Sequence, residues 1–101
     1  MGLTRDTLDY FALMYKLIRE GIFTDVALLN SRCMKSIRDF NNINEMLEYA
    51  QNTYCDSMII KVAGQKNYNH TLYFHRLNGF KLNRKSLVFF MTDGNKKIIR
   101  W

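Results

Sequence analysis

The sequence predicts an α+β protein in which three N-terminal helices are followed by an antiparallel β-meander of four or five strands. Apolar residues recur at helical spacing up to about residue 55, and from Ser57 they follow the two-residue period of strands. Asn-Gly and Asp-Gly pairs, which are typical of tight hairpin turns, then separate the strand-like segments. Three helices before a sheet also suggest a winged-helix-like arrangement, in which one helix reads the major groove of DNA.

Apolar spacing and residues that favour helix ends predict the first two helices. The first is expected from Thr4 or Asp6, either of which can cap it, to about Glu20. Gly21 suits the left-handed conformation that commonly ends a helix. The second helix is expected over 24–40, with its apolar face toward the first helix and its Arg and Lys residues outward.

A third helix is expected from Asn42 to about Cys55. Asn42 followed three residues later by Glu45 is an asparagine variant of the capping box, which marks the start of a helix. The polar face of this helix carries Glu, Gln and Asn but no Lys or Arg, so it is poorly suited to contacting DNA phosphates. We therefore place the predicted binding surface on the sheet.

The predicted meander contains two hairpins. A short apolar run at 58–62 comes first, and a hairpin over 70–85 follows it. The second hairpin joins 86–92 to 96–101 through a turn at Asp93-Gly94.

The first hairpin is predicted to turn at Asn78-Gly79, because both central residues of a type I′ turn need positive φ. In that register Arg76 stands opposite Lys81 and His75 stands opposite Leu82. Two cations side by side repel each other mildly, so an anion that neutralises them would stabilise the pair.

The charges of this chain are segregated along the sequence. The 101 residues, of which 48% are hydrophobic, suffice for a single domain (1–101) with a core of its own. The predicted helical half, 1–56, is slightly acidic, with six Lys or Arg and eight Asp or Glu. The predicted β half, 57–101, has nine Lys or Arg and one acid, Asp93. A basic half of this kind indicates a face that binds a polyanion.

The basic sheet predicts a small, non-catalytic protein that binds nucleic acid, RNA or single strands more than duplex DNA, in a regulatory or inhibitory role. Aromatic rings on a β-surface stack unpaired bases while Lys and Arg hold the phosphates. The candidate binding residues are Lys66, Tyr68, Tyr73, His75, Arg76, Lys81, Arg84, Lys85, Lys96, Lys97, Arg100 and Trp101.

A protein partner is the first alternative. Leu87, Val88, Phe89 and Phe90 make both faces of one predicted strand apolar, and three helices can cover only one of them. A homodimer or another protein would cover the second face. The alternative function is therefore a phage-type inhibitor that docks on a nucleic-acid-handling enzyme of a host.

A small metal-free ribonuclease is the third hypothesis. His70 and His75, with Tyr73, Arg76 and Lys81 nearby, are residue types that can transfer protons and stabilise a charged transition state. Five positions separate the two histidines, however, so on a regular strand they point to opposite faces. A shared acid–base site would need a bulge or bend between them.

No cofactor, metal or membrane is predicted as a partner. Cys33 and Cys55 are the only cysteines, and two residues without Cys/His spacing do not make a zinc site. No signal peptide opens the sequence, and its uncharged runs are too short to span a bilayer. We therefore expect a cytoplasmic protein with reduced thiols, in the host cytoplasm if the protein is viral.

Overall fold

The computed structural model describes residues 5–65 and 69–101, and it confirms the α+β class. The prediction of three helices followed by one meander is wrong, because the described residues form two α-helices and seven strands in two antiparallel sheets. In chain order the elements are α1 (Arg5–Arg19), β1 (Phe23–Leu29), β2 (Met34–Ser36), the 3-10 helix η1 (Ile37–Asp39), α2 (Ile43–Asn52), β3 (Ser57–Val62), β4 (Asn69–Tyr73), the 3-10 helix η2 (Phe74–Arg76), β5 (Leu77–Leu82), β6 (Ser86–Met91) and β7 (Lys96–Arg100).

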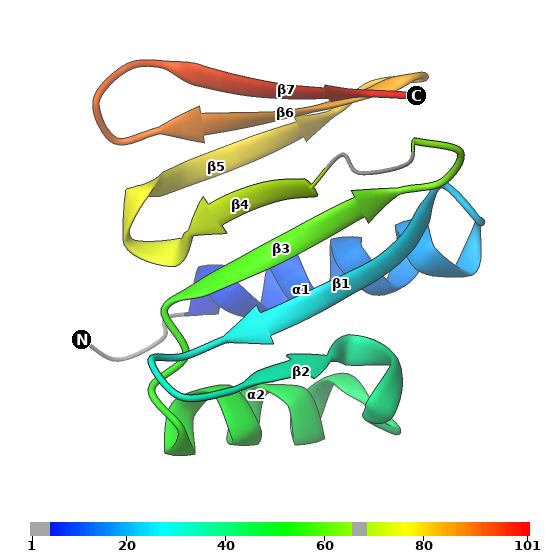
Figure 1. The fold of residues 1–101 in the computed structure, drawn as a ribbon. Coiled ribbons are helices and arrows are strands. Elements are labelled where there is room, and N and C mark those ends of the chain that lie inside the picture. The colour runs from blue at the N-terminus through cyan, green and yellow to red at the C-terminus, as the bar shows by residue number, and fades with distance from the viewer. Residues whose placement is uncertain (1–4, 66–68) are drawn as a thin grey trace.

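The first sheet has the strand order β2-β1-β3-β4, and the second has the order β5-β6-β7. The helix η2 connects β4 to β5, so the chain passes directly from an edge of one sheet to an edge of the other (Figure 1). In this view α1 lies behind the first sheet, and no helix of the described residues covers the face turned toward the viewer. The described fold therefore leaves a sheet face open.

The helix α1 forms where its apolar spacing predicts it. Phe11 and Leu17 are fully buried on its inner side. At its C-terminal end Gly21 has a φ of 78° and donates its N–H to the Ile18 carbonyl at 3.0 Å, while Ile22 donates to the Leu17 carbonyl at 3.0 Å. These two bonds form a Schellman motif, which satisfies carbonyls that the helix end leaves without a partner.

The helix predicted over 24–40 is wrong, because this segment forms β1, β2 and η1. In β1 the buried side chains of Val26 and Leu28 alternate with partly exposed ones, which is the period of a strand. β1 lies between β2 and β3, so its backbone groups pair on both sides, and this pairing overrides the apolar spacing that suggested a helix. Residues 1–56 are therefore not a helical half.

The third predicted helix is confirmed as α2. The side-chain oxygen of Asn42 accepts a hydrogen bond from the Glu45 N–H at 2.9 Å and caps the helix. The Glu45 carboxylate accepts in return from the N–H of Asn41 at 2.9 Å, one residue earlier than in a standard capping box. The predicted winged-helix-like arrangement is also wrong, because residues 24–40 do not form the helix that it requires.

The hairpin turn predicted at Asn78-Gly79 is wrong, because both residues lie inside β5. Leu77 pairs with Met91 and Phe80 pairs with Phe89, so two residues of β5 stand opposite one residue of β6. This arrangement is a β-bulge, and Gly79 adopts a φ of 107° within it.

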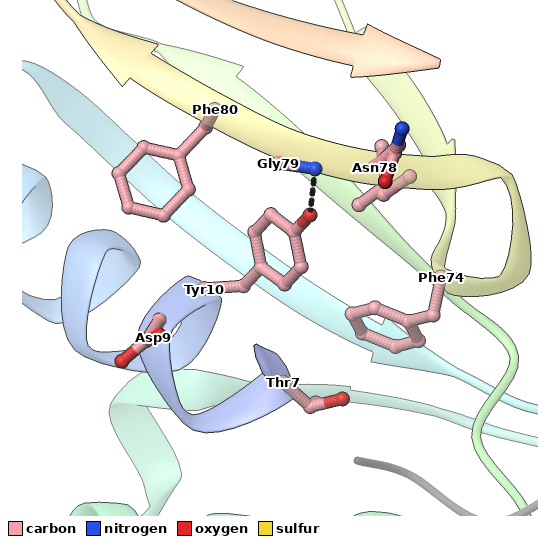
Figure 2. Close-up of a pocket in the computed structure, with 8 residues that line it drawn as sticks. Thr7, Asp9, Tyr10, Phe74, Asn78, Gly79 and Phe80 are labelled. Atoms are coloured by element: carbon pink, nitrogen blue, oxygen red, sulfur yellow. Dashed lines mark hydrogen bonds between the residues drawn. The ribbon is translucent and has the colours of Figure 1, made fainter. Parts of the chain in front are cut away.

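The side chain of Tyr10, in α1, contacts this bulge. The Gly79 N–H donates a hydrogen bond to the Tyr10 hydroxyl at 2.7 Å instead of to the neighbouring strand, as Figure 2 shows. The Tyr10 ring centroid lies 5.6 Å from that of Phe80 and 6.2 Å from that of Phe89. The first helix and the last sheet therefore share one core, which also includes Leu87 and Ile99.

The hairpin predicted over 70–85 does not form, because β4 pairs with β3 and β5 pairs with β6. The turn of the hairpin that β5 and β6 form lies at Arg84-Lys85. The Asn83 N–H donates to the Ser86 carbonyl at 2.8 Å, and Leu82 pairs with Leu87. The predicted second hairpin is confirmed, because β6 pairs antiparallel with β7 and Gly94 takes a φ of 88° in the turn between them.

Candidate nucleic-acid interface

The two faces of the second sheet differ in chemistry. Leu87, Phe89 and Ile99 are buried and face the core, whereas their neighbours along β6 and β7 point to the other side. We call that side the outer face of the second sheet. It carries Lys81, Val88, Phe90, Lys96, Ile98 and Arg100.

An apolar centre lies between the cations of the outer face. Lys81 pairs with Val88, which in turn pairs with Ile98, and Ile98 is 42% exposed. In the next row Phe90 pairs with Lys96, whose Nζ lies 5.8 Å from the centroid of the Phe90 ring. The surface is therefore amphipathic rather than simply charged.

The three cations are spread across the whole outer face. Lys96 and Arg100 lie four residues apart on β7, and Lys81 lies two strands away in the row between them. With strands about 4.8 Å apart and a rise of about 3.4 Å per residue, their backbone positions form a triangle with sides of about 12–14 Å. Three separate anionic groups of one extended ligand can thus be contacted at once.

Two further predicted cations lie at one end of this face. Arg84 and Lys85 form the exposed turn between β5 and β6. The Lys85 carbonyl accepts a hydrogen bond from the Trp101 N–H at 3.0 Å, and Ser86 pairs with Arg100. The turn and the C-terminal end of β7 therefore present Arg84, Lys85 and Arg100 together.

Several of the predicted binding residues do not lie on the outer face. Lys97 pairs with the buried Phe89, so it lies on the core-facing side and is half-buried. Trp101 packs edge-on against Phe23, with ring centroids 6.0 Å apart, and is no exposed stacking residue. Lys66 and Tyr68 lie outside the residues that the structure describes.

The predicted pair of opposed cations, Arg76 and Lys81, is wrong. Lys81 stands opposite Val88, because the bulge shifts the register of β5. Arg76 belongs to η2, and its carbonyl accepts a hydrogen bond from the Thr92 N–H at 2.9 Å. Arg76 therefore lies next to the turn between β6 and β7. In that turn hydrogen bonds from Asn95 lower the pKa of Asp93, and the charge of Arg76 adds a smaller effect in the same direction.

Tyr73, His75 and Arg76 form a second group at the junction of the sheets. The Arg76 guanidinium carbon lies 5.4 Å from the centroid of the Tyr73 ring, and the His75 ring centroid lies 6.0 Å from it. All three side chains are exposed. This group presents an aromatic ring with a cation on it.

The structure does not bring the two histidines together. His70 pairs with Ile60 on the core-facing side of the first sheet and is only 8% exposed. His75 lies beside Tyr73, whose position three residues along β4 places it on the opposite side of that sheet. The acid–base pair of the ribonuclease hypothesis is not formed.

The buried His70 gives a testable pH dependence of stability. Burial first, and then the charge of Lys97, lower the pKa of His70. Because the unfolded chain binds this proton near pH 6.5 and the folded chain resists it, the free energy of unfolding should fall as the pH drops below about 6.5. Urea unfolding between pH 7.5 and 5.5 measures this change. His70→Gln should reduce this fall in the free energy of unfolding, whereas His75→Gln, at an exposed position, should leave it unchanged. An equal fall in both variants would rule out His70 as the cause.

Two hollows flank α1 and α2. A cavity of about 360 Å³ lies between α1 and the bulge of β5, with Thr7, Asp9, Phe74 and Asn78 among its lining residues (Figure 2). A groove of about 350 Å³ runs between η1 and α2 and carries carboxylates, including those of Glu45 and Glu48. The acidic groove does not suit a polyanion.

The described residues include no cluster of three or more His, Cys, Asp or Glu arranged to hold a metal ion. Within those same residues, neither helix is long and apolar enough to cross a membrane.

Sequence reasoning missed one part of the outer face. Ile98 was not recognised as an exposed residue beside Val88 at the centre of this face. The alternation of Lys96, Ile98 and Arg100 along β7 is the signal that could have shown it, because alternate residues of a strand share a face.

Comparison with known proteins gives no relative from which a function could be inferred: no protein-family model, curated protein or solved structure matches the chain.

Proposed function

We propose that this protein binds nucleic acid, RNA or single strands in preference to duplex DNA, through the outer face of the second sheet and without catalysis. The observation that supports it is the position of Lys81, Lys96 and Arg100 around the apolar centre of Val88, Phe90 and Ile98. In such a complex the cations contact phosphates, while apolar and aromatic side chains contact sugars and bases. A regulatory or inhibitory role fits a binding protein of this size.

The form of the surface favours single strands over duplex DNA. Major-groove readers insert a helix or a two-stranded ribbon that carries side chains for the base edges. The exposed polar side of α2 carries Glu45 and Glu48 and no Lys or Arg, so it would repel phosphates. An open sheet face with spaced cations instead suits a flexible strand that lies across it.

Salt dependence tests the proposal. If between three and six of Arg76, Lys81, Arg84, Lys85, Lys96 and Arg100 contact phosphates, log K against log salt concentration for single-stranded RNA should have a slope between about −2 and −4. Fluorescence anisotropy of a labelled oligonucleotide, measured from 50 to 300 mM KCl, provides the slope. A slope near zero would contradict binding by these cations.

A protein partner with an acidic surface is the second candidate function. The exposure of Ile98, at 42%, and its aliphatic neighbour Val88 favour it, because such side chains fill the centres of protein interfaces. The cations would then form the rim and contact carboxylates. If the affinity for RNA does not change with salt concentration, binding to a protein partner replaces nucleic-acid binding as the proposed function.

A further inference from the structure

An exposed tyrosine lies on the open side of the first sheet, at the end of the strand that leads to the second sheet. In β4 the buried His70 and Leu72 alternate with Thr71 and Tyr73, which point away from the core. Tyr73 is 41% exposed and stands at the end of the strand, immediately before η2. Figure 1 shows that this end of β4 lies next to the second sheet.

The segment after Tyr73 is fixed at both of its ends. The Phe74 N–H donates to the Asp56 carbonyl at 2.9 Å, and the Phe74 ring packs edge-on against Phe11 with centroids 5.9 Å apart. Two residues later the Arg76 carbonyl accepts from the Thr92 N–H at 2.9 Å. The backbone between Tyr73 and Arg76 is therefore held in place before any ligand binds.

Arg76 places a positive charge beside the Tyr73 ring. Its guanidinium carbon lies 5.4 Å from the ring centroid, which is the distance of a cation–π contact. An arginine that stacks on an aromatic face keeps its in-plane N–H donors free for a phosphate. Tyr73 is still 41% exposed with Arg76 and His75 beside it, so part of its ring is accessible to a planar group.

We infer that Tyr73 stacks an unpaired base of a single-stranded nucleic acid whose backbone is held by Arg76 and by the cations of the second sheet. This inference rests on the proposed function and specifies its ligand. A base inside a duplex is already stacked on both sides, so only an unpaired base can use this ring. The ligand is then a single strand that spans the junction of the two sheets.

Tyr54 provides a matched control for this inference. It is also an exposed tyrosine, at 84%, but it lies in the turn before β3, two residues before the exposed Asp56. Tyr73, by contrast, has a cation on its ring and leads into η2, whose Arg76 is hydrogen-bonded to Thr92 in the turn before Lys96. Exposure alone does not distinguish the two tyrosines, whereas the neighbouring charges do.

The test compares Tyr73→Ala, Tyr73→Phe and Tyr54→Ala in the full chain. The probes are a 12-nucleotide single-stranded RNA of mixed sequence, the same strand with abasic positions throughout, and the duplex. Tyr73→Ala should weaken binding of the intact strand by about 5- to 150-fold, and Tyr73→Phe and Tyr54→Ala should bind like the wild type. For the abasic strand the loss caused by Tyr73→Ala should nearly vanish, and the wild type should bind the duplex more weakly than the single strand.

The failures of this inference and of the proposed function are distinguishable. If Tyr73→Ala binds the intact strand like the wild type while loss of the outer-face cations weakens binding, the stacking inference is wrong and the proposed function stands. A loss on the abasic strand as large as on the intact strand would also overturn stacking. If the wild type binds none of the three probes, both are wrong.

Discussion

Replacing Lys81, Lys96 and Arg100 together with alanine should lower the affinity for single-stranded RNA by about 100-fold at moderate salt. Each cation is expected to contribute about 1 kcal/mol through a charge-assisted contact with a phosphate, and about 3 kcal/mol corresponds to this factor. The salt slope should become shallower by about two units, because three phosphate contacts are lost. Since all three side chains are exposed, the melting temperature should change by no more than about 3 °C.

A variant with the same change in charge separates the site from net charge. Lys16, Arg19 and Arg32 are exposed cations of the N-terminal part of the chain, outside the second sheet. Their triple replacement by alanine also removes three positive charges from the formal net charge of +6. It should keep most of the RNA affinity. Equal losses in the two triple variants would show that binding depends on overall charge and not on the outer face.

Gly79→Val should lower the free energy of unfolding by about 2–3 kcal/mol, because a β-branched residue is strained at positive φ. Gly79 has a φ of 107°, and a Cβ at this position would lie 4.0 Å from the Phe90 side chain, which is an ordinary contact. The Cβ itself meets no collision, so backbone strain is the expected cause of the destabilisation. For a domain of about this size the melting temperature should fall by roughly 10–20 °C.

Asn78→Val is the matched control for this prediction. It places the same side chain in the same bulge at an exposed residue that does not have positive φ. Its unfolding free energy, measured with urea, should change by less than about 0.5 kcal/mol. A Gly79→Val protein as stable as the control would contradict this prediction, because it would show that the bulge does not require glycine at this position.

The elements that the sequence predicted correctly are those with local signals. Gly21 ends α1 and Asn42 begins α2 through hydrogen bonds to residues a few positions away, so a short stretch of sequence is sufficient to recognise them. β1 is different, because it is stabilised by pairing with strands on both sides. Its pairs with β3 join residues 28 to 39 positions apart, 34 for Val26 and Ile60, and no local pattern records them.

The predicted turn at Asn78-Gly79 is wrong because the sequence signal for it is ambiguous. A tight turn and a β-bulge both favour a glycine that adopts positive φ. What distinguishes them here is the Tyr10 hydroxyl, which is distant in sequence and accepts the hydrogen bond of the Gly79 N–H. The register of the whole hairpin depended on this choice.

For the candidate site, the sequence indicates which cations lie in the strands but not which face of the sheet each of them is on. Lys81, Lys96 and Arg100 were correctly placed in the strands that form the outer face. Lys97 is adjacent to Lys96 and therefore lies on the opposite face, because successive residues of a strand point to opposite sides of the sheet. A shift of one residue exchanges the faces, so the correct set follows only when the register is known.

The contact between α1 and the second sheet also affects how the chain folds while it is being synthesised. Tyr10 and Gly79 are separated by 69 residues, and Ile99 completes the core around them. At a translation rate of about 5–20 residues per second, α1 leaves the ribosome roughly 4–16 s before the last of these strands does. During that interval its apolar side has no second sheet to pack against, so we expect the nascent helix to be a binding site for chaperones.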